Sequence, residues 1–122
     1  MNDFLNIPDS LKLYTSNHFF IIKDSYPVSH GHLLIISNEL AEDYFDLSKK
    51  AKIELTDVLD EAKKLIEIEH SPDGYNIGMN CGKSAGQTIF HFHCHVIPRY
   101  KGDLKYPEGG VRGVIPNKMK YK

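Results

Sequence analysis

Three histidines alternate with other residues in the segment QTIFHFHCHVIPRY, residues 87–100. Successive side chains of a strand point to opposite faces of the sheet, so a strand here would place the three histidines on one face. They are His91, His93 and His95, and the other face would carry Phe90, Phe92, Cys94 and Val96 into the core. Three imidazoles on one face are costly to bury without partners. The spacing therefore predicts a histidine row that takes part in chemistry.

Two kinds of chemistry fit such a row. Neutral imidazoles on one face can bind a divalent metal, as sets of three histidines do at catalytic zinc. Alternatively, one imidazole can act as a nucleophile toward phosphorus while its neighbours orient it. The preceding segment NCGKSAGQT favours the nucleophile, because it combines small residues with the hydrogen-bond donors Asn80, Gln87 and Thr88, which suit a phosphate better than a metal. This segment has neither the P-loop spacing nor the GxGxxG of a dinucleotide-binding fold.

Strands are expected to position these residues. Runs of apolar residues bounded by turn residues predict strands at residues 17–24, 31–38, 75–80 and 87–97. Pro27 and Gly31 predict a turn between the first two strands, and residues 81–86 form a glycine-bearing loop before the last one.

One helix is expected between the two pairs of strands. From Ser48 onward, apolar residues recur at steps of three and four. Ser48 can cap the start of this helix, and Pro72 and Gly74 end it. The resulting order, β-β-α-β-β, predicts an antiparallel α+β domain.

Length and composition set the broad class. The 122 residues predict a single domain with a core at about residues 10–100 and a C-terminal arm at residues 101–122, which holds Pro and Gly without clear periodicity. The formal charge of −1 is too small for a nonspecific nucleic-acid binder. No stretch approaches the ~20 apolar residues of a membrane span, so we expect a cytoplasmic protein without a membrane partner. Cys81 and Cys94 form no CxxC pair and are expected to be reduced.

Two motifs resemble the histidine triad (HIT) superfamily. His91-Phe92-His93-Cys94-His95-Val96-Ile97 is similar to the family pattern of three histidines alternating with apolar residues. The segment DSYPVSHGHLLIIS resembles the family's upstream Asp-x-x-Pro-x-x-x-Gly-His, through Asp24, Pro27, Gly31 and His32. The matches extend from about Phe19 to Tyr100, and the tail GGVRGVIP resembles small prokaryotic members.

The resemblance implies a role for each matching residue. His93 would be the nucleophile, with its Nδ1–H donated to a backbone carbonyl, that of His91, so that Nε2 faces the phosphate. His95 would contact the α-phosphate and assist the leaving group, His91 would be chiefly structural, and His32 would complete the catalytic set from the adjacent strand. The expected substrate-binding residues are Asn80, Gln87 and Thr88 for phosphate oxygens, Asp24 for ribose hydroxyls, and Phe19 and Ile22, which either line a base pocket or belong to the core.

The implied fold is the HIT-like α+β domain, an antiparallel meander sheet with one main helix, and the expected state is a homodimer. The implied activity is cleavage at the α-phosphate of a nucleoside phosphoramidate or a dinucleoside polyphosphate through a nucleotidyl-histidine intermediate, with a purine nucleotide as substrate. We expect neither a cofactor nor a metal, since the N-terminus lacks the cysteine pair that some members use for zinc. Two alternatives stay open: a non-catalytic nucleotide-binding module that engages another protein, and a metal enzyme built on the three histidines.

Overall fold

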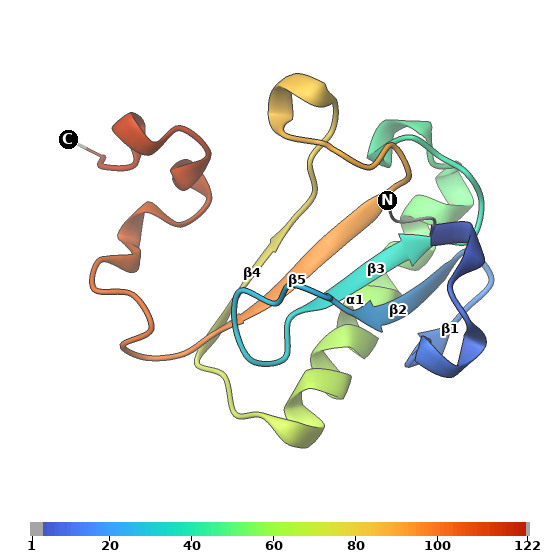
Figure 1. The fold of residues 1–122 in the computed structure, drawn as a ribbon, viewed down its shortest axis with the longest axis horizontal. Coiled ribbons are helices and arrows are strands. Elements are labelled where there is room, and N and C mark those ends of the chain that lie inside the picture. Colours follow the sequence, from blue (N-terminus) through green and yellow to red (C-terminus); the bar gives the residue numbers. More distant parts are fainter. Residues whose placement is uncertain (1–3, 122) are drawn as a thin grey trace.

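The computed structural model describes residues 4–121 and contains one five-stranded antiparallel sheet covered on one face by one long helix (Figure 1). The strands are β1 (Tyr14–Thr15), β2 (Phe19–Lys23), β3 (Leu33–Ser37), β4 (Gly74–Gly78) and β5 (His93–Arg99), and the helix is α1 (Lys49–Glu69). Short 3-10 helices lie at Phe4–Asn6, Asp9–Leu11, Tyr44–Asp46, Lys83–Ala85, Pro107–Val114 and Pro116–Lys118. The expected HIT-like α+β class is confirmed.

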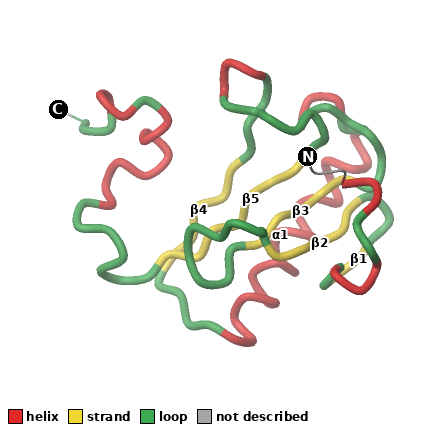
Figure 2. Tube along the Cα trace, in the orientation of Figure 1, coloured by secondary structure: helices red, strands yellow, loops and turns green. Residues whose placement is uncertain are grey.

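The strand order is β1-β2-β3-β5-β4, so only the first three strands follow one another as a simple meander. After β3 the chain crosses through α1 to the edge strand β4 and then returns as β5 between β4 and β3 (Figure 2). This return places the histidine-bearing strand directly beside β3, with His93 opposite Ile36 and His95 opposite Leu34.

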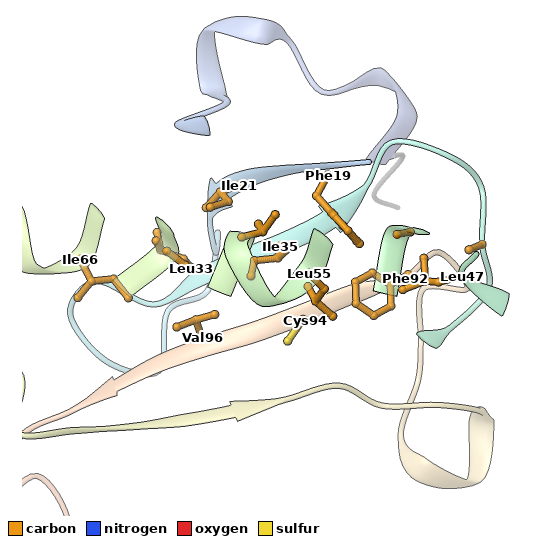
Figure 3. Packing of buried hydrophobic residues seen from close by; sticks show 14 residues of the cluster. Phe19, Ile21, Leu33, Ile35, Leu47, Leu55, Ile66, Phe92, Cys94 and Val96 are labelled. Atoms are coloured by element: carbon orange, nitrogen blue, oxygen red, sulfur yellow. The ribbon is translucent and has the colours of Figure 1, made fainter. Parts of the chain in front are cut away.

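The two central apolar runs are buried on both faces of the sheet. Within β2 and β3 every residue except Lys23 is buried, as continuous apolar strands require. Alternate residues face α1 and form the main core, shown in Figure 3: Phe19, Ile21, Leu33, Ile35, Phe92, Cys94 and Val96 from the sheet side meet Leu55 and Ile66 of the helix. The remaining residues form a second cluster on the other face, made of Phe4, Phe20, Ile22, Leu34 and Ile36.

The helix begins where its capping residue predicts. The hydroxyl of Ser48 accepts a hydrogen bond from the backbone N–H of Ala51 at 3.1 Å, which satisfies one of the free donors of the first turn. The buried positions Ala51, Leu55, Val58, Ala62 and Ile66 recur at steps of three and four and so make one apolar stripe against the sheet.

The last strand is shorter than the alternation predicts. It begins at His93, and residues 89–91 form a bend, so Phe90 is 45% exposed instead of facing the core. The prediction for Phe90 is wrong because the bend interrupts the strand periodicity. The prediction is correct for Phe92, Cys94 and Val96, which are buried in the main core. Burial raises the pKa of the Cys94 thiol to about 12.

The segment after β5 extends away from the sheet (Figure 1), and none of its residues up to 121 is buried. Its turns fold on themselves, with the guanidinium of Arg112 donating to the carbonyl oxygens of Lys118 and Met119 at 2.7 and 3.2 Å. None of the helices in residues 4–121 combines the length and the apolar character that crossing a bilayer requires.

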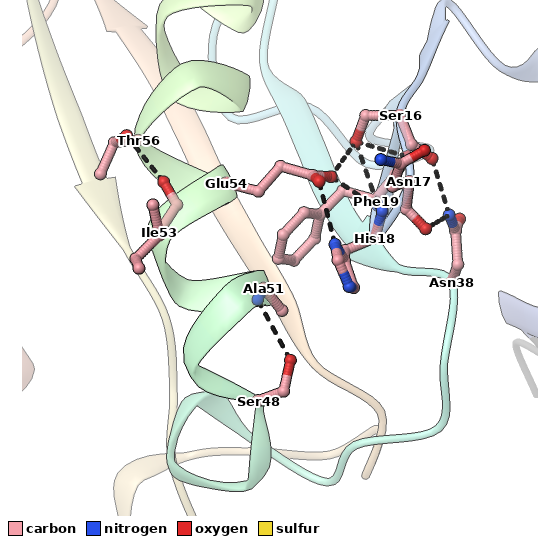
Figure 4. Close-up of polar contacts among 10 residues, drawn as sticks. All are labelled: Ser16, Asn17, His18, Phe19, Asn38, Ser48, Ala51, Ile53, Glu54 and Thr56. Atoms are coloured by element: carbon pink, nitrogen blue, oxygen red, sulfur yellow. Dashed lines mark hydrogen bonds and ion pairs between the residues drawn. The ribbon is translucent and has the colours of Figure 1, made fainter.

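A carboxylate on α1 fixes the helix to the β1–β2 hairpin (Figure 4). Glu54 accepts hydrogen bonds from the Ser16 hydroxyl, from the backbone N–H of His18 at 2.8 Å and from Nδ1 of His18 at 2.9 Å. Burial on its own would raise the pKa of Glu54, but the hydrogen bonds from Ser16 and His18 together lower it below its ordinary value. Since the folded-state pKa is lowered, this carboxylate stabilises the fold at neutral pH, and the contribution is lost as the pH falls through that value.

We predict that Glu54→Ala lowers the free energy of unfolding by about 2 kcal/mol at pH 7, because three donors lose a charged acceptor. Urea unfolding at pH 7 and at pH 3 would measure this, and the difference from the wild type should shrink at the lower pH. Glu61→Ala, which removes a carboxylate that pairs with Lys64 one turn away on the helix surface, is the matched control and should change the value by less than about 0.5 kcal/mol. Equal losses for both variants would contradict the account.

Candidate active site

The histidine row lies on the face of the sheet opposite α1. His93 and His95 alternate along β5 with Cys94 and Val96, which are buried against the helix. On the row's own face, Ile36 and Leu34 of β3 lie directly opposite the two histidines. The rings of His93 and His95 are 5.5 Å apart between centroids, so they are neighbours on one surface.

His91 is a buried structural residue at the bend that precedes β5. Its Nε2 is 2.7 Å from the carbonyl oxygen of Ser37, and because a carbonyl only accepts, Nε2 carries the proton and donates. The backbone N–H of Phe92 donates to the carbonyl of Ala41 at 2.6 Å in the same region. These bonds hold the start of β5 against the end of β3 and the segment after it.

His93 is held by one directional hydrogen bond. Its Nδ1 is 2.8 Å from the carbonyl oxygen of His91, so Nδ1 carries the proton and donates, which confirms the hydrogen bond expected from the sequence. In this tautomer Nε2 keeps its lone pair. The ring of Phe4 contacts His93 edge-on, with centroids 5.2 Å apart, and supports its orientation from the N-terminal segment.

His32 and His95 form a second hydrogen-bonded unit. The backbone N–H of Val28 donates to Nδ1 of His32 at 3.2 Å, so in neutral His32 the proton lies on Nε2. That Nε2 is 2.9 Å from Nδ1 of His95 and donates to it, which leaves the proton of His95 on its own Nε2. When His32 donates to His95, the hydrogen-bond chain from Val28 through His32 therefore favours the His95 tautomer that carries its proton on Nε2.

Burial keeps both rings of this pair neutral. The pKa of His32 is lowered by burial, which the nearby carboxylate of Asp24 only partly offsets. The pKa of His95 is lowered by burial and by the neighbouring His32 and His93, again against the opposing effect of Asp24. Asp24 lies at the end of β2, where its Oδ2 is 3.3 Å from Nε2 of His32 and its Oδ1 accepts from the backbone N–H of Tyr26.

Among residues 4–121, one group of side chains brings three possible metal-ligating atoms within 4.8 Å of one another: Asp24, His32 and His95. A metal ligand must offer a lone pair. The bond from Val28 instead places the proton of His32 on the nitrogen that faces the other two groups, and Nδ1 of His95 is already an acceptor. These donors fit a hydrogen-bond chain better than a metal, and His91 and His93 do not belong to the group.

A cavity of about 580 Å³ opens beside the histidine row. Its walls are mainly apolar and its polar groups include the carboxylate of Asp24; the lining residues are Phe4, Ile7, Ser10, Leu11, Leu13, Ile22, Lys23, Asp24, Ser25, Tyr26 and Leu34. Ile22 therefore lines this cavity and also belongs to the second apolar cluster. Phe4, Ile7 and Tyr26 were missed, because nothing in the pattern of the N-terminal segment indicates that it folds back over the sheet.

Two expected substrate-binding residues have other positions. Of the two alternatives for Phe19, the structure supports the core, because its side chain is fully buried on the helix face and contacts Phe92. The prediction for the Gln87 side chain is wrong. Its amide donates to the carbonyls of Glu42 and Ile89 and accepts from the backbone N–H of Gly82, so it stabilises the loop and has no donor left for a phosphate.

The other two loop residues are accessible. Asn80 and Thr88 are exposed, and within residues 4–121 neither side chain has a hydrogen-bond partner. Gly86 adopts a φ of +95°, a backbone conformation that glycine reaches without strain, and so allows the tight turn of this loop.

The chain matches the family model described as "HIT domain" over residues 6–102. It is 34% identical to "Protein hit" of Bacillus subtilis over 95 residues, which are 77% of this chain and 66% of that protein. It is 32% identical to "AP-4-A phosphorylase" of Mycobacterium tuberculosis over 104 residues, 83% of this chain and 53% of that protein. The chain thus spans less than two thirds of the length of these relatives.

Solved structures agree with the fold. The crystal structure of a hypothetical histidine triad nucleotide-binding protein from Sulfolobus tokodaii superposes with a TM-score of 0.71 at 38% identity, and the match covers 76% of this chain and 62% of that one. The similarity therefore extends over about three quarters of this chain.

We predict that Gln87→Ala lowers the free energy of unfolding by about 2 kcal/mol, because buried backbone groups lose their partners. Thr88→Ala, a neighbouring change at an exposed hydroxyl, should alter it by less than about 0.5 kcal/mol. Urea unfolding of both variants beside the wild type measures the difference. A Gln87→Ala protein as stable as the wild type would argue against the structural role of this amide.

Proposed function

The chain belongs to the HIT family, and from this we propose that it is a nucleotide-binding hydrolase or transferase that cleaves at an α-phosphate through a nucleotidyl-histidine intermediate. The substrate would be a nucleoside phosphoramidate or a dinucleoside polyphosphate. The observation that carries the proposal is the hydrogen bond from Nδ1 of His93 to the carbonyl of His91. It leaves Nε2 with a lone pair on the face of the sheet opposite α1. The "AP-4-A phosphorylase" relative supports nucleotide chemistry in general.

In the first step, Nε2 of His93 forms a bond to the α-phosphorus while the bond from phosphorus to the leaving group breaks. The leaving group departs with the electron pair of that bond. The hydrogen bond to the His91 carbonyl stabilises the positive charge that the ring acquires, because Nδ1–H becomes a stronger donor.

His95 has the position and the tautomer to assist this departure. Its proton lies on Nε2, so that nitrogen can donate a hydrogen bond to the leaving atom as charge develops on it. In the second step water attacks the phosphorus, the bond to His93 breaks, and the nucleoside monophosphate is released. The proton that water gives up balances the one that the leaving group takes.

The cavity beside the row suits the nucleoside. Its apolar walls, with Phe4, Ile7 and Ile22, can pack against a base, and Asp24 can accept from ribose hydroxyls near the histidines. Asn80 and Thr88 are exposed on the loop before β5 and can donate to phosphate oxygens. We propose a purine as the base, as the family resemblance implies.

Two further expectations belong to this proposal. We propose that residues 1–122 form one domain whose core, about residues 10–100, is followed by an arm at residues 101–122, and that the chain forms a homodimer. The open edge of the sheet at β4, where Ile77 is 48% exposed, supports pairing with a second copy. Analytical ultracentrifugation would test it, and a monomer at micromolar concentration would contradict it. The cytoplasmic location stays a prediction.

We predict that His93→Ala loses turnover of adenosine 5′-phosphoramidate and of diadenosine polyphosphates by about 10³-fold or more while AMP still binds. Release of AMP would be followed with a chelator present and with no metal added. The matched control is His30→Ala, which removes a histidine of the β2–β3 loop outside the row and should leave turnover within about twofold.

Each other outcome favours a different function. AMP binding without turnover by the wild type would favour the non-catalytic binding module. Turnover that the chelator stops would favour a metal enzyme. Among active proteins, the better of the two substrates would identify the branch.

A further inference from the structure

Asp24 is shared between the proposed sugar site and the histidine chain. Its carboxylate lines the nucleotide cavity, and the same Oδ2 lies 3.3 Å from Nε2 of His32 and 3.7 Å from Nδ1 of His95. The other oxygen, Oδ1, is held by the backbone N–H of Tyr26 at 2.8 Å, which fixes the carboxylate in place. A group that binds Oδ2 from the cavity therefore acts directly on the acceptor that His32 faces.

We propose that Asp24 couples sugar binding to the orientation of the His95 proton through His32, so that the sugar hydroxyls promote turnover as well as binding. This inference rests on the proposed function and adds a route by which substrate recognition reaches the leaving group. His32 is a positioning residue in this scheme, since its ring is 3% exposed and acts through His95.

The physical basis is one proton with two acceptors. Nε2 of His32 carries the proton because Val28 donates to its Nδ1, and both Nδ1 of His95, at 2.9 Å, and Oδ2 of Asp24, at 3.3 Å, can accept it. An ionised carboxylate is the stronger acceptor, although it lies farther away. With the cavity empty, the proton is therefore divided between two partners, and the His32–His95 bond is weakened.

A hydroxyl that donates to Oδ2 changes this division. The carboxylate then accepts a hydrogen bond from the sugar and becomes a weaker acceptor for His32. The proton on Nε2 of His32 is therefore donated mainly to Nδ1 of His95. His95 is in turn fixed in the tautomer that carries its proton on Nε2, which is the one that donates toward the leaving atom. With a substrate that lacks sugar hydroxyls, the proton of His32 stays divided between Asp24 and His95. Such a substrate therefore loses part of the rate increase that a positioned general acid provides.

The kinetic test compares adenosine 5′-phosphoramidate with its 2′,3′-dideoxy analogue. For the wild type we expect the dideoxy substrate to raise KM and to lower kcat by about tenfold, a part of the 10²–10⁴ that acid catalysis supplies. In His32→Ala the kcat values for the two substrates should become equal, while the ratio of KM values persists because Asp24 still binds hydroxyls. His32→Gln, whose amide N–H can replace the ring donor, should restore part of the kcat difference between the two substrates. If His32→Ala does not fold, the comparison of His32→Gln with the wild type still tests the coupling.

A second readout does not depend on turnover. The ring ¹⁵N shifts of His95 would be followed while the wild type is titrated with AMP and with 2′,3′-dideoxyadenosine 5′-monophosphate. We expect AMP to move them toward a single tautomer protonated on Nε2 and the dideoxy nucleotide to do so less.

These outcomes separate the two claims. A protein that turns over neither phosphoramidate but shows the AMP-specific shift retains the coupling and loses the proposed function. Equal shifts with both nucleotides, the absence of any binding, or a kcat ratio that His32→Ala does not change would overturn the coupling.

Discussion

The candidate site depends on one hydrogen bond, from Nδ1 of His93 to the carbonyl oxygen of His91. It selects the tautomer of His93 in which Nδ1 carries the proton and Nε2 is the ring nitrogen with a free lone pair. The carbonyl is in place because His91 is itself fixed, through its bond to Ser37, and because Phe92 is held by Ala41. The bend that ends the alternation before β5 is therefore the feature that orients His93.

The sheet keeps its two faces chemically distinct. Helix α1 covers one face with a continuous apolar stripe, which removes Cys94 and Val96 from water (Figure 3). His93 and His95 alternate with these residues along β5 and so lie on the other face. On that other face the N-terminal segment supplies Phe4 and makes one wall of the cavity, while the histidines themselves stay half-buried. Burial is thus sufficient to keep His95 neutral without closing the site.

The local sequence pattern predicts the main elements and the histidine row, and the alternation along a strand also decides between the two alternatives for Phe19 and Ile22. Phe19 and Ile22 are three residues apart on one strand, so they must lie on opposite faces, and only Ile22 shares a face with the histidines. The use of the Gln87 amide was not predictable, because its acceptor at Glu42 is 45 residues away in sequence. The same holds for Phe4, whose contact with His93 spans most of the chain and follows from the tertiary fold.

The most direct test of this account is to trap the intermediate. The wild type would be mixed with adenosine 5′-phosphoramidate, quenched within milliseconds at alkaline pH, where phosphorus–nitrogen bonds to histidine survive, and analysed by peptide mass spectrometry. The account predicts an AMP adduct on the peptide that contains residues 91–95, assigned by fragmentation to His93 and formed and lost at rates consistent with turnover. An adduct on His95 or His32, or turnover with no adduct at all, would contradict it.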